Sequence, residues 1–327
     1  MRCLVTGGAG YIGSHVVLLL GEAGHDVIVY DNLSTGFPWA VLAGELIVGD
    51  TGDHELLDAV FAEHGFDVVL HFAAHIIVPE SVADPLKYYR NNTANSLALL
   101  EACRKHRVRQ FVFSSTAAVY GDPARVPIAE DAPCAPINPY GHSKYMSERM
   151  LRDVAAATDL RYVILRYFNV AGADLQGRLG QATPQATHLI KLACEAALGK
   201  RDRLEVFGTD YPTPDGTCIR DYLHVADLAR VHVQALEYLR RGGASTVLNC
   251  GYGHGASVKE VIEMVKRVSG RDFPVHNAER RPGDPPQLVA ANARILSTLG
   301  WRPAHDDLET IVRSALQWEA KLPVAGG

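Results

Sequence analysis

A run of closely spaced glycines directly after the first apolar segment limits the fold of this chain more than any other feature. The segment Cys3–Thr6 has the character of a buried strand, and Ser14–Glu22 has the apolar spacing of a helix. Between them stand Gly7, Gly8, Gly10 and Gly13. Glycines in such a turn let the backbone approach a pyrophosphate closely, and the helix N-terminus supplies amide N–H groups to it. The order strand, turn, helix therefore predicts a dinucleotide-binding unit.

An aspartate after the second predicted strand fits the same interpretation. Asp31 directly follows the strand Asp26–Tyr30. A carboxylate at this position accepts hydrogen bonds from the ribose hydroxyls and repels a 2′-phosphate, which favours NAD over NADP. Asp50 follows the third predicted strand, Leu46–Val48. It lies either where an adenine amino group would arrive or in a simple turn, and the sequence leaves both open.

The first half of the chain alternates strand and helix patterns. Further predicted strands are Val68–Phe72, Phe111–Ser114 and Tyr162–Arg166, and further predicted helices are Glu55–Glu63, Asn95–Arg104 and Lys144–Ala157. This alternation predicts an α/β fold, a doubly wound parallel Rossmann sheet with helices on both faces. After about Ala171 glycine and proline become denser, and we expect irregular elements in a smaller mixed α/β substrate-binding lobe. The predicted domains are residues 1–172 and residues 173–327, with some segments of the second returning to the first.

The composition excludes several classes of protein. The net charge is −5, whereas a general nucleic-acid or membrane-surface binder needs a basic face. The six cysteines form no CxxC pair, which disfavours a disulfide framework or a zinc ribbon and favours a reducing compartment. The 14 histidines show no HExxH spacing, so we expect no metal. We also expect no signal peptide and no membrane span, and therefore a cytoplasmic enzyme.

The segment 138–144 gives the strongest indication of catalysis. Asn138 and Pro139 suit the start of a helix, so Tyr140 and Lys144 lie one turn apart on the same face. A phenol with a pKa of about 10 is a poor base at neutral pH. A neighbouring ammonium and the positive charge of an oxidised nicotinamide would stabilise the phenolate. The spacing predicts Tyr140 as the base, with its pKa lowered by Lys144.

Hydroxyl side chains end another strand of the predicted sheet. Ser114, Ser115 and Thr116 lie at the carboxyl edge, where ligands bind to sheets of this type. A hydroxyl there could contact both a substrate oxygen and the tyrosine, although turn chemistry alone also explains a polar strand end. The combination of the glycines, Asp31, Thr116 and the tyrosine–lysine pair, in this order, is far more specific than any one member.

The chain resembles the extended short-chain dehydrogenases/reductases, and within them the UDP-glucose 4-epimerase family, nearly from end to end. The matching segments are TGGAGYIGSH, HFAA, PESV, YYRNN, SSTAAVYG, NPYGHSK, LRYFNVAGA, VFGTDYPTPDGTCIRDYLHVADLA and RRPGD. The resemblance implies a reversible 4-epimerisation of UDP-glucose and UDP-galactose through a 4-keto sugar, with tightly bound NAD. It further implies a homodimer and a place in galactose metabolism.

The resemblance also implies a role for each matching residue. The NAD site would comprise Gly7, Gly10, Tyr11, Ile12, Gly13, Asp31, Asn32, Leu33, Ser34, Thr35, Gly36, Asp50, Thr51, Phe72, Ala73, Ala74, Ile76, Asn91, Thr116, Tyr140, Lys144 and Phe168. The UDP-sugar site would comprise Thr116, Tyr140, Asn169, His188, Leu189, Glu205, Val206, Phe207, Arg220, Arg281, Asp284 and Leu288. Tyr140, Lys144 and Thr116 would be catalytic. Arg220 and Arg281 suit a diphosphate, because guanidinium groups pair with phosphate oxygens.

Three positions depart from the family pattern and leave alternatives open. Ile76 stands where some members carry a lysine that reaches the cofactor ribose, His188 where others place Asn, and Leu288 where relatives carry Tyr or a small residue. Leu288 leaves UDP-GlcNAc open as a substrate, and UDP-xylose or UDP-glucuronate are further alternatives. A nucleotide-sugar dehydratase is disfavoured, because Ala117 and Ala118 follow the catalytic threonine in place of an acid pair. A non-catalytic NAD-sensing protein is least favoured, since it needs no tyrosine–lysine pair.

Overall fold

The structure is a computed structural model, which describes residues 1–183, 186–281 and 283–323. Seven strands form its central sheet: β1 (Arg2–Thr6), β2 (Asp26–Asp31), β3 (Glu45–Val48), β4 (Val68–His71), β5 (Gln110–Thr116), β6 (Arg161–Tyr167) and β11 (Thr246–Cys250). Their order across the sheet is β11-β6-β5-β4-β1-β2-β3, and every neighbouring pair is parallel. The predicted doubly wound parallel sheet is confirmed.

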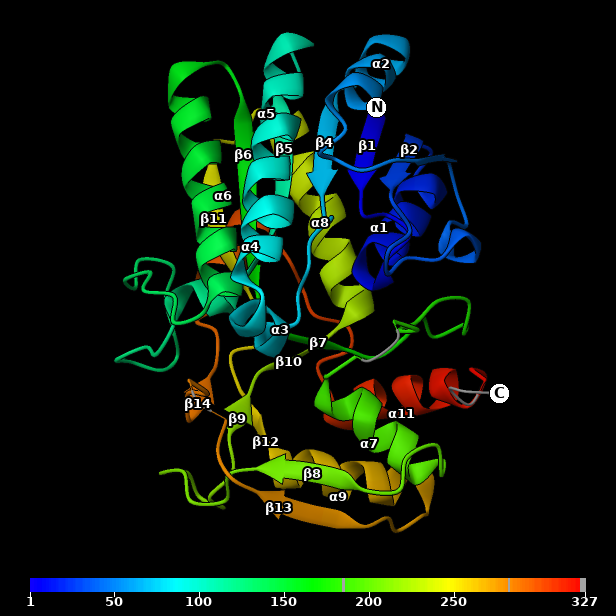
Figure 1. The fold of residues 1–327 in the computed structure, drawn as a ribbon, viewed down its shortest axis with the longest axis vertical. Helices are drawn as coiled ribbons and strands as arrows, with labels where there is room; N and C mark the ends of the chain where they lie inside the picture. Colours follow the sequence, from blue (N-terminus) through cyan, green and yellow to red (C-terminus); the bar gives the residue numbers. More distant parts are fainter. Residues whose placement is uncertain (184–185, 282, 324–327) are drawn as a thin grey trace.

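Helices cover both faces of this sheet, which is why its inner strands are apolar on both sides. One face carries α1 (Tyr11–Glu22) and α8 (Val225–Arg240), and the other carries α2 (His54–His64), α5 (Asn95–Lys105) and α6 (Pro139–Ala157) (Figure 1). Two short helices, α3 (Val78–Ala83) and α4 (Pro85–Tyr88), lead into α5 through a π-helical turn at Tyr89–Ala94. Single 3₁₀ turns lie at Pro38–Ala40 and Ala117–Tyr120.

The remaining elements lie beyond the carboxyl ends of the strands (Figure 1), except the helix Ala293–Leu299, which contacts β11 and α8. They are β7 (Asn169–Ala171), α7 (Leu189–Ala197), β8 (Leu204–Phe207), β9 (Ile219–Arg220), β10 (Tyr222–His224), β12 (Ala256–Ser257), α9 (Val258–Ser269), β13 (Val275–Ala278), β14 (Gln287–Leu288), α10 (Ala293–Leu299) and α11 (Leu308–Glu319). Three small sheets pair β10 with β7, β13 with β8, and β12 and β14 with β9. We expected irregular structure after Ala171, and this was wrong for α8, α9 and α11, because the glycines and prolines lie mostly in the connections.

One hydrophobic core joins the two parts of the molecule. It runs from Val5 and Val29 in the sheet, through Leu228 in α8, to Ile190 in α7 and Ile311 in α11. The last sheet strand, β11, and the helix α8 both come from the second half of the chain and pack on the sheet. Over the described residues, no helix combines the length and the apolar character needed to cross a membrane.

Candidate functional site

The glycine-rich turn between β1 and α1 is held by close backbone packing. The Gly7 N–H donates to the Tyr30 carbonyl over 2.9 Å, and Gly7 has a φ of 73°, which favours glycine. A Cβ added at Gly7 would lie 2.5 Å from the Ala73 nitrogen, and one added at Gly13 would collide with the Gly7 carbonyl oxygen. The fold itself therefore requires glycine at both positions.

Gly10 has fewer close neighbours than Gly7 and Gly13, and this shows whether the turn has room for a dinucleotide. An added Cβ would have one neighbour among the described residues, the Gly7 carbonyl oxygen at 3.3 Å. Gly10 is also the N-cap of α1, and within the described chain no side chain caps its amides. This contact is tight but it is on one side of Gly10, and the remaining space suits a pyrophosphate lying against the loop and the amides of α1. The turn therefore fits the dinucleotide that the sequence predicts.

Asp31 ends β2 beside this turn. Its carboxylate accepts hydrogen bonds from the Ala9 N–H over 2.9 Å and from the Leu33 N–H over 2.8 Å. Burial raises the pKa of Asp31, and the two backbone donors oppose that rise. Each carboxylate oxygen retains further acceptor capacity, which is what a ribose diol requires.

Asp50 follows β3 and is held by several donors. Its carboxylate accepts from the Gly52 N–H over 2.8 Å, from Asn95 Nδ2 over 2.9 Å and from Asn32 Nδ2 over 2.7 Å. The Gly52 bond is the turn contact that the sequence allowed as an alternative. The structure thus shows the turn contact, and a contact to adenine stays a prediction.

Tyr140 and Lys144 lie at the carboxyl edge of the sheet, in the first turns of α6. Asn138 caps this helix by accepting from the Gly141 N–H over 2.9 Å, with Pro139 at the first helical position. Tyr140 and Lys144 are both buried, and the Lys144 ammonium donates to the Ser114 carbonyl oxygen over 2.9 Å. Burial raises the pKa of Tyr140, and the Thr116 hydroxyl opposes this rise. Burial also lowers the pKa of Lys144 to about 7.

The hydroxyl groups that end β5 have three different surroundings. Ser114 Oγ lies 2.9 Å from His232 Nε2 of α8, and Ser115 Oγ donates to Glu148 over 2.6 Å. Thr116 Oγ1 accepts from the Ala118 N–H over 3.1 Å, and of the three hydroxyls it is the one that bears on Tyr140. The structure therefore brings Thr116 and Tyr140 together, as predicted.

Sequence reasoning missed two neighbours of the tyrosine–lysine pair. Tyr88 packs edge-on against the Tyr140 ring, with the ring centres 6.4 Å apart. Glu148 raises the pKa of Lys144 from one helical turn further along α6, and it is itself bound by Arg166 over 2.6 Å. The spacing of four residues from Lys144 was the signal that could have identified Glu148. Tyr88 lies in the matching segment YYRNN, but no spacing linked it to Tyr140.

Several residues that the sequence predicts to contact the diphosphate and the sugar lie on or beside the small sheets. Arg220 in β9 is buried and pairs with Asp284 over 2.7 Å, and its strand neighbour in β14 is Leu288. Arg281 stacks on the Phe207 ring, with its guanidinium carbon 3.8 Å from the ring centre. Three segments that are distant in sequence thus meet in one place.

The other predicted substrate residues are distributed around this group. Asn169 in β7 lies beside Tyr222 in β10, and its N–H donates to the Asp221 carbonyl over 3.0 Å. Val206 points into the hydrophobic core, so only its backbone is available to a ligand. Glu205 pairs with Arg203 over 3.2 Å at the surface.

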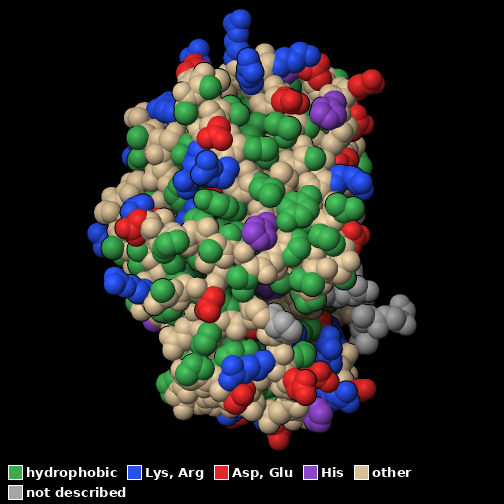
Figure 2. All heavy atoms as spheres, turned by 60° about the vertical axis from the view of Figure 1, so that its left-hand side comes forward, with side chains coloured by type: hydrophobic (Ala, Val, Ile, Leu, Met, Phe, Trp, Pro, Cys, Tyr) green, Lys and Arg blue, Asp and Glu red, His purple; other side chains and the backbone are tan. Residues whose placement is uncertain are grey.

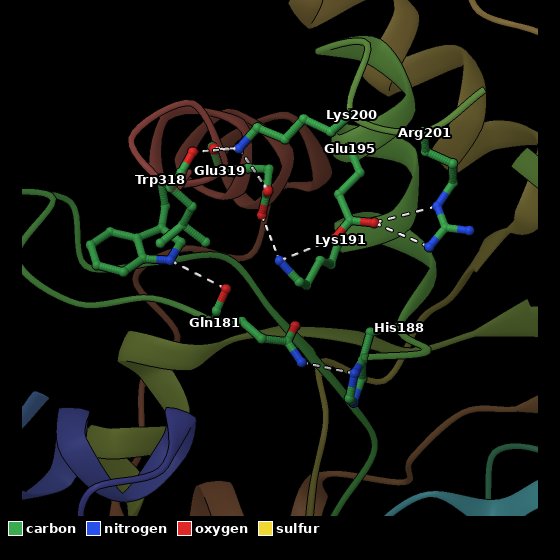
Figure 3. Close-up of polar contacts among 9 residues, drawn as sticks. Gln181, His188, Lys191, Glu195, Lys200, Arg201, Trp318 and Glu319 are labelled. Carbon is green, nitrogen blue, oxygen red and sulfur yellow. Dashed lines mark hydrogen bonds and ion pairs between the residues drawn. The ribbon is translucent and has the colours of Figure 1, made fainter. Parts of the chain in front are cut away.

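His188 and Leu189 begin α7, at a polar cluster that also contains residues from α11 (Figure 3). His188 is the N-cap of this helix, and its Nδ1 lies 2.9 Å from Gln181 Nε2. Lys191 of α7 pairs with Glu319 of α11 over 2.6 Å. Leu189 packs against the main core.

The remaining predicted cofactor residues are distributed over several segments that follow or begin elements of the sheet half of the molecule. Gly36 lies against Ala9, Thr51 is buried, and the Phe72 ring is 4.7 Å from that of His232. Tyr11 and Ile12 start α1; Asn32, Leu33, Ser34 and Thr35 follow β2; Ala73, Ala74 and Ile76 follow β4; Asn91 lies in the π-helical turn, and Phe168 joins β6 to β7. The Ile76 side chain is 47% exposed and hydrophobic, so it offers no polar contact to a ribose.

His71 ends β4 and is a buried histidine with both ring nitrogens in hydrogen-bond contact. Its Nδ1 lies 2.6 Å from Thr6 Oγ1 and its Nε2 lies 3.0 Å from Ser96 Oγ. Among residues 1–183, 186–281 and 283–323, no group of three or more His, Cys, Asp or Glu is placed to hold a metal ion.

The glycine turn, Asp31 and the Tyr140–Lys144 pair at one edge of a parallel sheet define a Rossmann-type dinucleotide-binding protein. The sequence pattern of the NAD dependent epimerase/dehydratase family matches residues 3–251. The chain belongs to this family.

Individual relatives match nearly the whole chain. A UDP-glucose 4-epimerase from Azospirillum brasilense is 62% identical over 100% of this chain and 94% of its own length. The crystal structure of UDP-glucose 4-epimerase from Brucella ovis in complex with NAD has a TM-score of 0.94 and 48% identity, covering 97% of this chain and 98% of that one. The UDP-Glc/GlcNAc 4-epimerase from Campylobacter jejuni has a TM-score of 0.87 and 49% identity, covering 98% and 99% of the two chains.

Proposed function

We propose that this chain catalyses the reversible 4-epimerisation of UDP-glucose and UDP-galactose, with NAD as its bound cofactor. The observation that carries the proposal is that Tyr140 contacts Thr116, and Lys144 contacts the same strand at Ser114, at the edge of the sheet that also presents the glycine turn and Asp31. The high identity to UDP-glucose 4-epimerases over nearly the full length supports the same assignment.

NAD supplies a hydride acceptor and donor at carbon 4 of the sugar when it is bound. Gly10 and the amides of α1 hold the diphosphate in our proposal, and Asp31 holds the adenosine ribose. Tyr140 takes the proton of the 4-hydroxyl group and later returns it to the 4-keto oxygen. Thr116 orients that oxygen, and Lys144 holds the nicotinamide ribose and stabilises the phenolate by its charge.

Epimerisation further requires that the keto sugar turns over while the nucleotide stays bound. Arg220 and Arg281 come from different loops, and we propose that both grip the diphosphate. Arg220 is already paired with Asp284 over 2.7 Å, so the incoming phosphate would share this guanidinium with the carboxylate. An anchored diphosphate and a loosely held sugar allow hydride to return to the opposite face.

UDP-GlcNAc is a second candidate substrate. Leu288 lies in β14 opposite Arg220 and packs in the cluster that contains Phe168. A leucine there leaves more space beside a sugar than a tyrosine and less than a small residue. The 49% identity to a UDP-Glc/GlcNAc 4-epimerase favours testing this substrate. A dehydratase finds no support, since Ala117 and Ala118 follow Thr116 in the 3₁₀ turn.

The direct test is to mix purified protein with UDP-galactose, without added NAD, and to assay UDP-glucose. Conversion without added NAD supports both the epimerase activity and the retention of NAD during purification. If conversion appears only when NAD is added, the epimerase assignment stands, but the protein does not bind NAD tightly. If neither condition yields UDP-glucose, the assignment is wrong. A parallel assay with UDP-N-acetylgalactosamine decides whether Leu288 admits an N-acetyl group.

We further propose that the enzyme acts as a homodimer in the cytoplasm, in galactose metabolism, with residues 1–172 mainly holding NAD and residues 173–327 mainly holding the UDP-sugar. Leu97 on α5 and Met146 on α6 are 44% and 43% exposed, which suits an intersubunit contact. Figure 2 turns the α6 side of the molecule forward and shows hydrophobic side chains spread over its middle. Six free thiols suit a reducing compartment.

A further inference from the structure

The side chain of Gln181 is placed to decide which nitrogen of His188 carries the proton. The Gln181 amide nitrogen lies 2.9 Å from His188 Nδ1, and Gln181 is 8% exposed. An amide N–H group can only donate, so the Nδ1 atom that it meets must be the unprotonated nitrogen of a neutral ring. The single proton of that ring then resides on Nε2.

Two further features favour a neutral ring. His188 caps the N-terminus of α7, where the helix dipole disfavours a positive charge. Lys191 lies one turn along the same helix and also disfavours protonation. Among the described residues that line this cavity, the other charged group is Glu319, and its carboxylate is bound by both Lys191 and Lys200.

The direction of the ring is visible in Figure 3. The lysines and carboxylates of the cluster lie on one side, and the His188 ring points away from them. The cavity that His188 lines also includes Gly172, whose carbonyl accepts from the Tyr11 hydroxyl over 2.6 Å. The wall of the cavity that His188 lines is thus in contact with Tyr11 at the start of α1.

We propose that Gln181 is a positioning residue, which holds His188 as the Nε2–H tautomer so that it offers one N–H donor to an oxygen of the bound nucleotide-sugar. This proposal rests on the proposed function. An asparagine at position 188 would also present an N–H donor, and its amide would need no partner to fix a tautomer. A histidine there needs such a partner, and Gln181 is placed to be that partner.

The proposal has a spectroscopic consequence that a merely structural role would not produce. In protein labelled with ¹⁵N-histidine, the His188 signals are identified by their loss in His188→Asn. At neutral pH we expect a protonated Nε2 and an unprotonated Nδ1, and a mixture of tautomers in Gln181→Met. A protonated Nδ1 or an imidazolium in the wild-type protein would overturn the proposal.

The kinetic test uses the same variants with UDP-galactose. Gln181→Met should raise KM by the inverse of the Nε2–H fraction that the NMR spectrum gives, about twofold for an even mixture, and leave kcat unchanged. The same substitution in a His188→Asn background should leave KM unchanged. Gln176 is exposed in the same loop, and Gln176→Met serves as the matched control.

Each kinetic outcome decides between distinct explanations. If Gln181→Met raises KM equally in both backgrounds, Gln181 supports the loop and not the histidine, and the proposal fails. An unchanged KM in Gln181→Met also contradicts it. Absence of epimerase activity in the wild-type protein would instead contradict the proposed function, while the tautomer seen by NMR would still test the role of Gln181.

Discussion

The Lys144 ammonium donates to the Ser114 carbonyl oxygen over 2.9 Å, inside a buried region. Burial lowers the pKa of Lys144 to about 7 and raises the pKa of Tyr140. Both shifts disfavour the charged forms of the separate groups. A phenolate and an ammonium formed together stabilise each other, and a positive nicotinamide adds to this. The pKa of Tyr140 is raised even with Lys144 in place, contrary to the sequence expectation, so its lowering in the working enzyme requires the charge of the nicotinamide as well.

Replacing the proposed base should change the rate of the reaction without changing the binding of NAD. Tyr140→Phe keeps the ring and its packing on Tyr88 but removes the group that accepts the proton. We expect kcat to fall by about 10²–10⁴-fold, with NAD content of the purified protein unchanged. Cofactor release by denaturation measures the second quantity. Near-normal turnover would show that another group is the base.

Replacing the lysine should move the pH dependence as well as the rate. Lys144→Met removes the cation that stabilises the phenolate, so the limb of the kcat profile set by Tyr140 should shift to higher pH. We expect kcat at neutral pH to fall by about 10²-fold or more. A uniform loss of rate with no change in the shape of the profile would contradict the role given to Lys144.

The buried ion pair between Arg166 and Glu148 should contribute strongly to the free energy of unfolding. Arg166 and Glu148 are 1% and 0% exposed and pair over 2.6 Å. Arg166→Met leaves the Glu148 carboxylate buried, with the partly exposed Arg152 at 3.5 Å as an ion-pair partner, and we expect the free energy of unfolding to fall by about 3 kcal/mol. Urea unfolding measures this change.

Two comparisons test the explanation of that loss. The double variant Arg166→Met/Glu148→Gln should be more stable than Arg166→Met alone, because neither charge of the buried pair remains. The pair Arg109–Asp159 is 68% and 69% exposed, and Arg109→Met should cost less than about 1 kcal/mol. A double variant less stable than the single one would contradict the account.

Buried histidines should make stability depend on pH on the acid side. Burial lowers the pKa of His71 to about 3 and that of His232 to about 4, against about 6.5 in an unfolded chain. The folded state binds fewer protons between these values, so the stabilisation is complete above about pH 6.5 and is lost as the pH falls toward the folded pKa. From pH 7.5 to 5.5, His71 alone accounts for about 1.3 kcal/mol.

The measurement is the free energy of unfolding in urea at both pH values. His71→Asn should show a smaller difference between them than the wild-type protein does. His54 is exposed at the start of α2, and His54→Asn should leave the difference unchanged. An equal pH dependence in wild type and His71→Asn would exclude His71 as a source.

The first half of the fold could be predicted because each of its elements carries a local pattern. Apolar runs such as Val68–His71 are buried on both faces, and this double burial removes the alternation that would identify a half-exposed strand. The strand Thr246–Cys250 was missed because its place beside β6 depends on tertiary pairing across more than eighty residues of chain. The helix Val258–Ser269 carries a capping box at Ser257 and Glu260, which a closer search for caps could have found.

The predicted site shows the same limit. Tyr140, Lys144 and Asp31 follow from spacing within a single strand–helix unit, and the structure places them at one sheet edge. Gln181 has no local pattern that links it to His188, because their contact arises from the path of a loop. Pairings between distant segments, such as Arg220 with Asp284, arise in the same way and need coordinates to be seen.

The most direct test of the central claim follows the hydrogen at carbon 4. Purified protein without added NAD is mixed with UDP-galactose that carries deuterium at this carbon, and the UDP-glucose formed is examined by mass spectrometry and NMR. Because the proposed mechanism removes and returns the hydride within one site, we predict UDP-glucose that retains deuterium at carbon 4. Product in which the label is exchanged with solvent, or no conversion at all, would contradict the account.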